Sequence, residues 1–353
     1  MKVHQIDTPA LILEKAVFDG NLQTMKNLLS MTSMALRPHY KSHKCAAIVK
    51  LQLEQGAKGI TCAKLSEAED LAQMGVEDIL IANQIVQPEK LPRVAALAKK
   101  CRLSICVDTT ENILALEEAM AADDATLYCL VEYEVGMLRC GVETHEEFVE
   151  LAKLISRQPH LVFEGIQAYA GNLSHETDLP RRQQASDEIE RDLTALKKAL
   201  TDAGLPPKEI TGGSTGTVEN KPGNSIYTEM QCGSYVFMDR SYGTLGLNFK
   251  NALFLLTSVV STRKNYFITD GGTKSLGLDQ GAPTVVGYEK HPLKLSEEHG
   301  RIELDGHTCR LNDKIRYIPG HCCTTVNIHD RIYVVDGEDV VDVWDVTSRG
   351  KSQ

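Results

Sequence analysis

Basic residues near the start of the chain stand in a pattern that suits amine chemistry. Segment 37–44 reads RPHYKSHK and follows an apolar run typical of a β-strand. Side chains alternate along a strand, so Arg37, His39 and Lys41 are expected to share one face. A lysine shielded from water beside other cations has a lowered pKa, which frees its amine to form a Schiff base. A solvated basic loop is an equally good interpretation of these residues alone.

A second group of residues has the chemistry of a metal site. Segment 319–327 reads PGHCCTTVN, and residues i and i+2 of an extended chain face the same way. His321 and Cys323 are therefore expected to bind one ion, while Cys322 points away. A nitrogen and a thiolate suit zinc or a similar metal, and two protein ligands leave positions open for water or substrate. On spacing alone, two core cysteines beside a loop histidine are the better interpretation.

Further candidates lie where later strands are predicted to end. Arg139 stands in the loop EVGMLRCG, and the segment QAYAGNLSH contains Tyr169 and His175. An imidazole titrates near neutrality and suits proton transfer, although a loop histidine explains His175 as well. Turns rich in glycine and hydroxyl groups present N–H groups to anions, and such loops often bind phosphate in β/α barrels. The residues of these two turns are Thr211, Gly212, Gly213, Ser214, Gly233, Ser234 and Tyr235.

The elements that must position these residues alternate between β-like runs and helical patterns. Alternation of this kind predicts parallel strands with helical crossovers, and eight strands favour an (α/β)8 TIM-type barrel over an open sheet. Ser66 and Glu69 have the spacing of a capping box, whereas residues 217–227 have no helical pattern. The predicted strands are Ala35–Lys41, Gly59–Ala63, Asp78–Ala82, Leu103–Val107, Thr126–Glu132, Val162–Tyr169, Glu209–Gly212 and Thr228–Gly233.

After about residue 245 short β-like runs follow one another without helices, which predicts a mostly β second domain. We therefore expect the barrel over residues 11–245 and the β domain over 246–353, joined by residues 1–10. The strand-like run Thr8–Leu13 is expected to join the β domain. The predicted strands of this domain are Leu253–Ser261, Asn265–Thr269, Pro283–Val286, Lys314–Ile318 and Arg331–Val335.

The motif RPHxKxHK resembles that of the D-serine dehydratase / D-threonine aldolase family, and the later motifs follow in that family's order over nearly the whole chain. These are fold-type III enzymes of pyridoxal 5'-phosphate (PLP), related to alanine racemase in the barrel. The resemblance implies that Lys41, rather than Lys44, carries PLP as a Schiff base. It also places His39 among the cofactor-binding residues.

The resemblance assigns roles to the other candidates. It implies that Arg139 and Tyr169 contact the cofactor, that the two glycine-rich turns bind its phosphate, and that His175 lies near the substrate hydroxyl. It reverses the interpretation of the His-x-Cys pair, so that His321 and Cys323 hold a divalent metal. Zinc is favoured, with manganese and magnesium as alternatives. This chain departs from the family at Ala170, where histidine or aspartate is usual.

The implied function is a PLP- and metal-dependent lyase acting on β-hydroxy D-amino acids. Aldolases of the family more often have aspartate at the second metal ligand, so Cys323 favours a dehydratase that converts D-serine or 3-hydroxyaspartate to a 2-oxo acid and ammonia. The alternative is a D-threonine aldolase, which gives glycine and an aldehyde. A racemase is disfavoured by the metal pair, and a non-enzymatic PLP carrier is disfavoured by the long β domain.

Composition narrows the partners of the chain. The net charge of −10 and the absence of a long basic run argue against nucleic acid or an anionic membrane. Ten scattered cysteines and a start without a signal-like apolar core predict reduced thiols in the cytoplasm. The expected partner is a small amino-acid substrate, and family analogy implies a homodimer.

Overall fold

The computed structural model describes residues 1–221, 223–291, 293–304 and 306–353. The chain divides into two compact units. The barrel unit comprises residues 26–40, 51–233 and 351–353, and the β unit comprises residues 1–25, 41–50 and 234–350. Beyond the segments that we expected, the β unit also contains residues 11–25, 41–50 and 234–245.

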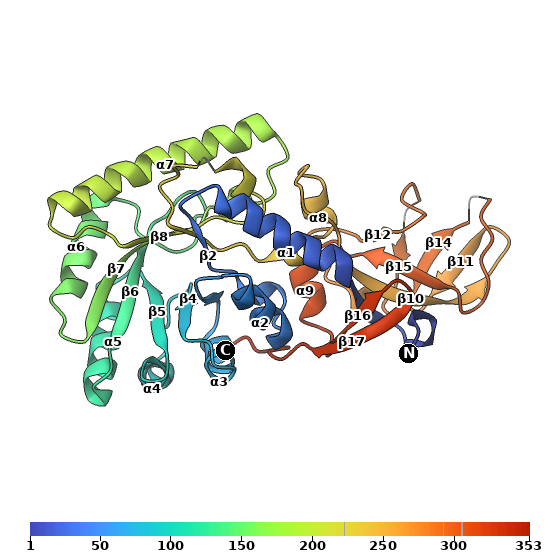
Figure 1. The fold of residues 1–353 in the computed structure, drawn as a ribbon, viewed down its shortest axis with the longest axis horizontal. Coiled ribbons are helices and arrows are strands. Elements are labelled where there is room, and N and C mark those ends of the chain that lie inside the picture. Colours follow the sequence, from blue (N-terminus) through green and yellow to red (C-terminus); the bar gives the residue numbers. More distant parts are fainter. Residues whose placement is uncertain (222, 292, 305) are drawn as a thin grey trace. The chain divides into compact units, whose positions relative to one another are not determined.

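The barrel unit is built on an eight-stranded parallel sheet (Figure 1). A parallel bridge between His39 and Thr61 joins the chain after the first strand to the second, so the sheet closes on itself. Backbone bonds from Lys58 N to Leu36 O (2.8 Å) and from Thr61 N to Pro38 O (2.9 Å) support this closure. In spatial order the strands are β2 (Ala35–Leu36), β9 (Glu229–Met230), β8 (Glu209–Gly212), β7 (Leu161–Ala168), β6 (Leu127–Glu132), β5 (Arg102–Val107), β4 (Asp78–Ile81) and β3 (Ile60–Cys62).

Helices connect the parallel strands from β2 to β8, whereas the described residues between β8 and β9 contain only a 3-10 turn. Buried apolar residues line one side of crossover helices such as α4, where they are Leu91, Val94, Ala95 and Leu97. No described helix has both the length and the apolar character needed to cross a bilayer. The helices are α1 (Lys15–Ser30), α2 (Ala46–Glu54), α3 (Leu65–Gln73), α4 (Leu91–Ala98), α5 (Thr110–Asp123), α6 (His145–Ser156), α7 (Leu179–Asp202), α8 (Arg240–Gly243) and α9 (Cys322–Val326).

The predicted barrel is confirmed, because each of the eight predicted strands contains or overlaps a strand of the sheet. The helix-free prediction for 217–227 also holds in its described residues, which contain a single 3-10 turn at Val218–Asn220. The predicted capping box is wrong by two residues. Lys64 is the N-cap of α3, and Glu67 accepts the Lys64 and Ala63 N–H groups at 3.1 and 2.9 Å.

A charged network lies at the amino-terminal ends of the barrel strands. Arg37 Nε donates to Glu229 Oε1 at 2.9 Å, and Arg37 Nη1 donates to Asp78 Oδ1 at 2.8 Å. Asp78 and Glu229 are the first residues of β4 and β9. Arg102 adds an ion pair with Glu164 at 2.9 Å. The charges at this end therefore compensate one another inside the barrel unit.

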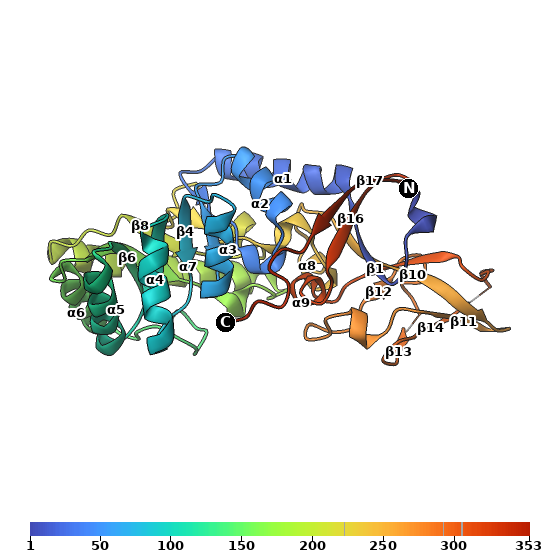
Figure 2. The same ribbon diagram turned by 90° about the horizontal axis from the view of Figure 1, so that it is seen from below.

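The β unit contains a nine-stranded sheet, and several of its strands, including β1, β10, β16 and β17, are labelled in Figure 2. Its main path runs β13-β14-β11-β10-β1-β16-β17, and β15 pairs with both β10 and β12. All pairs are antiparallel except β1 with β16. The strands are β1 (Ala10–Glu14), β10 (Leu253–Thr262), β11 (Tyr266–Thr269), β12 (Thr284–Val285), β13 (Lys294–Leu295), β14 (Gly300–Glu303), β15 (Lys314–Ile318), β16 (Arg331–Asp336) and β17 (Asp339–Asp345).

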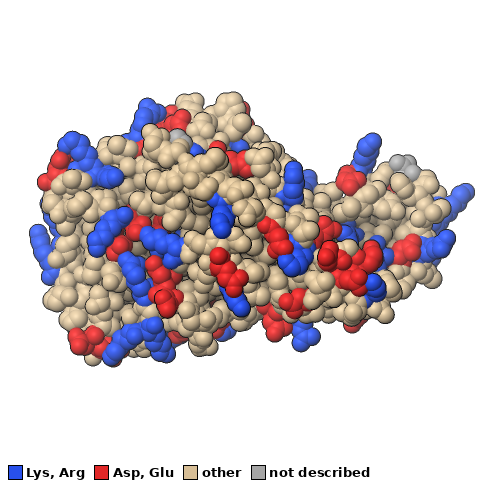
Figure 3. Space-filling model, in the orientation of Figure 1, with Lys and Arg blue, Asp and Glu red and all other residues tan. Residues whose placement is uncertain are grey.

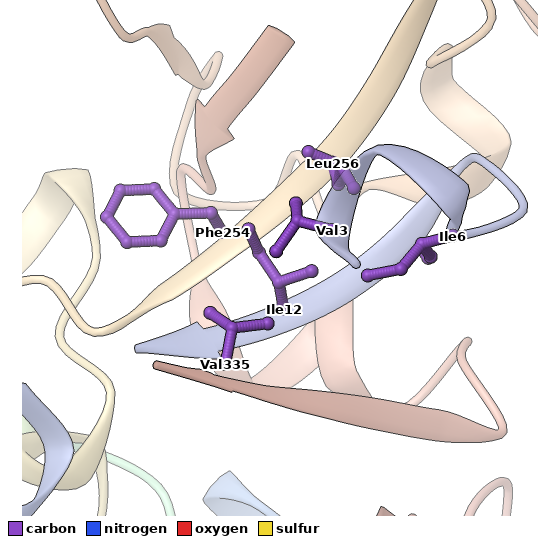
Figure 4. Packing of buried hydrophobic residues seen from close by; sticks show 7 residues of the cluster. Val3, Ile6, Ile12, Phe254, Leu256 and Val335 are labelled. Carbon is purple, nitrogen blue, oxygen red and sulfur yellow. The ribbon is translucent and has the colours of Figure 1, made fainter. Parts of the chain in front are cut away.

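The N-terminal run joins this sheet, as predicted. β1 lies between β10 and β16, and its residues Ala10–Leu13 are buried on both faces of the sheet, which fits its almost wholly apolar sequence ALILE. Figure 4 shows Ile12 of β1 packed among residues that come from three other parts of the chain. The labelled members of this cluster are Val3, Ile6, Ile12, Phe254, Leu256 and Val335.

Three strands of the β unit were not predicted: β13, β14 and β17. β13 has two residues, and β17 is an edge strand whose sequence DVVDVWD is mostly exposed, so neither has the apolar pattern that marks a buried strand. On the face shown in Figure 3, acidic and basic side chains are interspersed rather than gathered into a field of one sign.

Candidate active site

Lys41 lies in the β unit, within a 3-10 turn formed by Tyr40–Ser42, and its side chain is half-buried. The chain leaves the extended conformation before this residue, so strand alternation does not reach it. The prediction that Arg37, His39 and Lys41 share one face is therefore wrong. Arg37 belongs to the charged network at the amino-terminal strand ends, whereas His39 is buried and its N–H donates to Cys232 O at 3.2 Å.

The carboxyl end of β6 brings together two of the predicted residues in the barrel unit. The guanidinium carbon of Arg139 lies 5.7 Å from the centre of the Tyr169 ring. Arg139 Nη2 also pairs with Glu132 Oε1 at 3.5 Å, and Gln84 Nε2 donates to Glu132 Oε2 at 2.6 Å. Burial raises the pKa of Glu132, although Gln84 and Arg139 oppose the shift. A cation held over a ring and beside an acid is well placed to meet an anionic or phenolic ligand atom.

Glu132 and Glu134 are site residues that we did not predict. Glu134 accepts the N–H groups of Met137 at 2.6 Å and of Arg139 at 3.2 Å, and it also accepts that of Gly136. The sequence signal was present, since an acid ends an apolar strand and a second acid opens a glycine-containing loop. This loop places Arg139, whose side chain is 48% exposed.

His175 follows a 3-10 turn at Gly171–Leu173, just after β7, and is half-buried. A Cβ at Gly171 would lie 2.6 Å from the Tyr169 ring and 2.7 Å from Met137 Sδ, so only glycine lets this turn approach the tyrosine. The Tyr169 hydroxyl lies 3.5 Å from Ser174 Oγ. The tyrosine and the segment before His175 therefore form one packed turn.

The first glycine-rich turn closes β8 with buried residues. Gly213 has φ of +68°, in the left-handed region, and a Cβ at Gly212 would lie 2.0 Å from Ala168 O. Ser214 N donates to Thr217 Oγ1 at 3.1 Å, which holds the turn. Thr211 Oγ1 accepts a bond of 2.9 Å from Gln231 Nε2. A buried turn of glycines and hydroxyls fits a phosphate group, because it presents donors without side-chain bulk.

The second turn begins at Gly233 and continues into a 3-10 turn, Ser234–Val236, in the β unit. Gly233, Ser234 and Tyr235 are all buried. Met238 N and Phe237 N donate to Ser234 O at 2.8 and 3.1 Å, so these residues form a single helical turn.

The predicted metal pair lies where β15 ends and the short helix α9 begins. His321 is the N-cap of α9 and has extended backbone angles, but Cys322 and Cys323 are helical. The extended-chain argument for this pair is therefore wrong, and Cys322 does not point fully away, because its Sγ lies 4.0 Å from Cys323 Sγ. The two predicted ligands nevertheless interact through their side chains.

The thiolate form of Cys323 is the form that binds a metal, whereas the His321 imidazole must lose its second proton to do so. The hydrogen bond from Cys322 lowers the pKa of Cys323 well below its usual range, against burial, and His321 and Ser42 add to the shift. Burial lowers the pKa of His321, but Cys323 and Asp279 outweigh it and raise that pKa to about 9. His321 Nδ1 donates to Asp279 Oδ2 at 2.6 Å, which leaves Nε2 as the ligand atom. Within the described residues, no three His, Cys, Asp or Glu side chains form a ready-made metal cluster.

The turn that carries the pair is held by a buried carboxylate that the sequence did not single out. Asp239 Oδ2 accepts Cys322 N at 2.9 Å, and Asp239 Oδ1 accepts Tyr242 N at 2.9 Å. Arg240 N donates to Pro319 O at 2.9 Å. A Cβ at Gly320 would lie 2.0 Å from Gly281 O, so the close approach of the two loops requires glycine.

Comparison with known proteins agrees with this geometry. Residues 15–241 match the family described as "Alanine racemase, N-terminal domain", and residues 252–335 match "Putative serine dehydratase domain". The chain is 37% identical to 3-hydroxy-D-aspartate aldolase of Paracoccus denitrificans, over 99% of this chain and 94% of that protein. It is 27% identical to D-threo-3-hydroxyaspartate dehydratase of a Delftia species, over 96% of this chain and 97% of that protein.

Solved structures show the same relationship. The crystal structure of D-threonine aldolase from Filomicrobium marinum superposes with a TM-score of 0.95 at 36% identity, covering 99% of this chain and 97% of that one. Similarity of this extent spans both units and both sets of candidate residues. The chain therefore belongs to the D-serine dehydratase / D-threonine aldolase family, with an alanine racemase-like fold, and is a PLP-dependent lyase.

Proposed function

We propose that this enzyme cleaves the Cα–Cβ bond of β-hydroxy D-amino acids such as D-threonine and 3-hydroxy-D-aspartate, giving glycine and an aldehyde. The observation that carries the proposal is the graded similarity of the full chain. Identity is 36–37% to aldolases acting on these two compounds, against 27% to a dehydratase of the same family. This difference in sequence identity extends over 96–99% of the chain. It therefore outweighs the single position Cys323, which favours a dehydratase.

The candidate residues would have separate roles in binding the cofactor. Bound PLP supplies an electron sink for the pair of electrons left at Cα, and a divalent metal supplies a Lewis acid. Lys41 binds the cofactor, with His39 as a further contact, and the turns Thr211–Ser214 and Gly233–Tyr235 bind its phosphate. Arg139 and Tyr169 orient the ring, because their side chains lie against one another at the end of β6 and β7.

His321 and Cys323 would hold the metal against the substrate hydroxyl. Asp279 fixes the imidazole, since it accepts the Nδ1 proton at 2.6 Å. An imidazole and a thiolate are ligands that zinc prefers, so we expect zinc rather than manganese or magnesium. His175 would accept the proton of the substrate hydroxyl, which is the step that retro-aldol cleavage requires.

A dehydratase is the second candidate, and Cys323 favours it. In that reaction Lys41 would remove the α-proton and the hydroxyl would leave as water, with the metal supplying a Lewis acid. Hydrolysis of the enamine product would then give a 2-oxo acid and ammonia. A racemase is less favoured, because it has no use for a metal beside the hydroxyl.

Product analysis tests the proposal. The purified enzyme is incubated with D-threonine, 3-hydroxy-D-aspartate and D-serine, and with the L-isomers of the first two as controls, with and without a chelator. Glycine plus an aldehyde from the D-isomers, abolished by the chelator and restored by Zn²⁺, supports the aldolase. Oxo acid plus ammonia as the main products would establish the dehydratase, and chelator-resistant loss of optical purity would establish the racemase.

The assembly and compartment are also proposals. We propose a homodimer, as family analogy implies, and light scattering of the purified enzyme tests it. We propose a cytoplasmic enzyme because all ten cysteines, each in the described part of the chain, are free thiols. Detection of the native enzyme in an exported fraction would contradict this location.

A further inference from the structure

The sulfur of Cys323 contacts two buried serines that come from distant parts of the chain. A hydrogen bond of 3.3 Å joins Cys323 Sγ to Ser42 Oγ, and Cys323 Sγ lies 3.6 Å from Ser234 Oγ. Ser42 is 1% exposed and Ser234 is 4% exposed. All three residues belong to the β unit, so these contacts lie within one compact body.

Each serine belongs to an element that we assign to the cofactor. Ser42 ends the 3-10 turn that contains Lys41, and Ser234 begins the 3-10 turn that follows Gly233. In a turn of three residues the terminal hydroxyl is at most two positions from the other residues, so its place depends on how the whole turn is held. The candidate metal ligand therefore touches both turns through their hydroxyl groups.

The backbone behind Cys323 leaves the sulfur little freedom to move away from these serines. Asp239 is fully buried and accepts Cys322 N at 2.9 Å, and Thr325 Oγ1 donates to His321 O at 2.7 Å. Because the first turn of α9 is tied from two sides, a shift of Ser42 changes the surroundings of the sulfur rather than the position of the helix.

We propose that Ser42 is a positioning residue that couples metal binding to PLP binding through its hydrogen bond to Cys323. The inference rests on the proposed function, because it takes Lys41 as the cofactor residue and Cys323 as a metal ligand. When Lys41 is anchored by PLP, the Ser42 hydroxyl is held against the sulfur and fixes the position from which that sulfur would bind a metal. Such coupling is reciprocal, so metal also tightens PLP binding by the same factor.

Metal affinity measured in two states of the enzyme tests this coupling. The holoenzyme is freed of metal with a chelator, and half of it is then stripped of PLP with hydroxylamine. Zn²⁺ is titrated into both forms with a competing chromophoric chelator. In the wild type we expect Zn²⁺ to bind roughly tenfold more tightly to the PLP-loaded form, the size of effect typical of contacts behind a metal ligand. In Ser42→Ala the ratio is expected to fall to within about twofold of unity.

Two variants separate coupling from general damage to the fold. Ser42→Thr keeps the hydroxyl and is expected to keep the coupling. Ser275→Ala is a matched control, because Ser275 is also a buried serine that ends a three-residue 3-10 turn of the β unit, and its hydroxyl bonds to Gly272 O at 2.9 Å. It is expected to leave the ratio unchanged.

The coupling is overturned by equal Zn²⁺ affinities in the two wild-type forms, or by a Ser42→Ala ratio equal to that of the wild type. These outcomes concern binding alone. Failure of the proposed reaction shows instead as the absence of glycine and aldehyde from enzyme that still binds PLP and Zn²⁺, so the two failures are distinguishable.

Discussion

The barrel unit pairs an arginine with a glutamate at each end of its strands, and the two pairs differ in every respect that matters for function. At the amino-terminal end, Arg37 and Glu229 lie 2.9 Å apart with side chains 3% and 1% exposed. At the carboxyl end, Arg139 and Glu132 lie 3.5 Å apart, and Arg139 is 48% exposed. Both acids are buried in strands; Arg37 directly follows β2 and is itself buried, whereas Arg139 stands on an exposed loop.

The difference shows how the same residue types serve structure at one end and chemistry at the other. Arg37 has a second acidic partner in Asp78, so its donors are used by the protein itself. Arg139 keeps part of its guanidinium in solvent and can exchange water for a ligand. A pair whose arginine is buried contributes to the fold, whereas a pair whose arginine stands on an exposed loop is available for binding.

The largest effect is expected at Lys41, and its neighbour Lys44 separates cofactor chemistry from structure in the same way as the two arginines. Lys41→Ala is expected to abolish both the PLP absorption band and the activity, because the amine that binds the cofactor is gone. Lys44→Ala is the matched control and is expected to keep the band. Absorbance spectra of the two purified variants decide this, and a Lys41→Ala protein that still forms the band would refute the assignment.

Arg37→Met is expected to destabilise the fold, because Arg37 belongs to the buried pair. Removing one partner of a buried pair leaves Glu229 without its arginine, which costs about 3–5 kcal/mol of the free energy of unfolding. Urea denaturation followed by circular dichroism measures the loss. Arg37→Met combined with Glu229→Gln is expected to recover part of the stability, since no unpaired charge remains buried. Loss of PLP binding in a folded Arg37→Met protein would contradict the structural role.

Arg139→Gln is expected to lower the activity and to leave the stability nearly unchanged. The free energy of unfolding should change by less than about 1 kcal/mol, because Arg139 is half exposed and the buried Glu132 keeps its hydrogen bond from Gln84. The rate of substrate cleavage is expected to fall roughly 10²-fold, as when one preorganised donor is lost from a site. Steady-state kinetics and thermal denaturation on the same preparation test both halves. A large loss of stability with unchanged kcat would show that Arg139 serves the fold rather than the reaction.

Glu132→Gln is expected to have the smallest effect, roughly a tenfold loss of activity, because the acid only steadies Arg139. Its pKa is raised in the folded state by burial, so its contribution to stability is full below the pKa of the unfolded chain and is lost as pH rises through the folded value. The stability of Glu132→Gln relative to the wild type should therefore increase with pH over that window. Denaturation midpoints of both proteins across the acidic range check the sign.

The sequence pattern predicted the architecture, because the positions of long buried strands and helices depend on local periodicity. Apolar runs alternating with helical patterns specify parallel strands and crossovers, and the eight predicted strands agree with the sheet. The N-terminal run was assigned to the β sheet for a similar reason, since ALILE is apolar on both faces. Short or exposed strands such as β13 and β17 carry no such pattern, because little of their surface is buried.

The residue types of the candidate site were also readable in the sequence, since Lys41, Arg139, Tyr169, His321 and Cys323 stand in motifs of the family. Only the tertiary structure decided which side chains meet. It placed Arg37 with Asp78 and Glu229, which are 41 and 192 residues away in the chain, and it brought Ser42 to Cys323 across 281 residues. Contacts at such separations depend on how strands and turns pack, which no local pattern encodes.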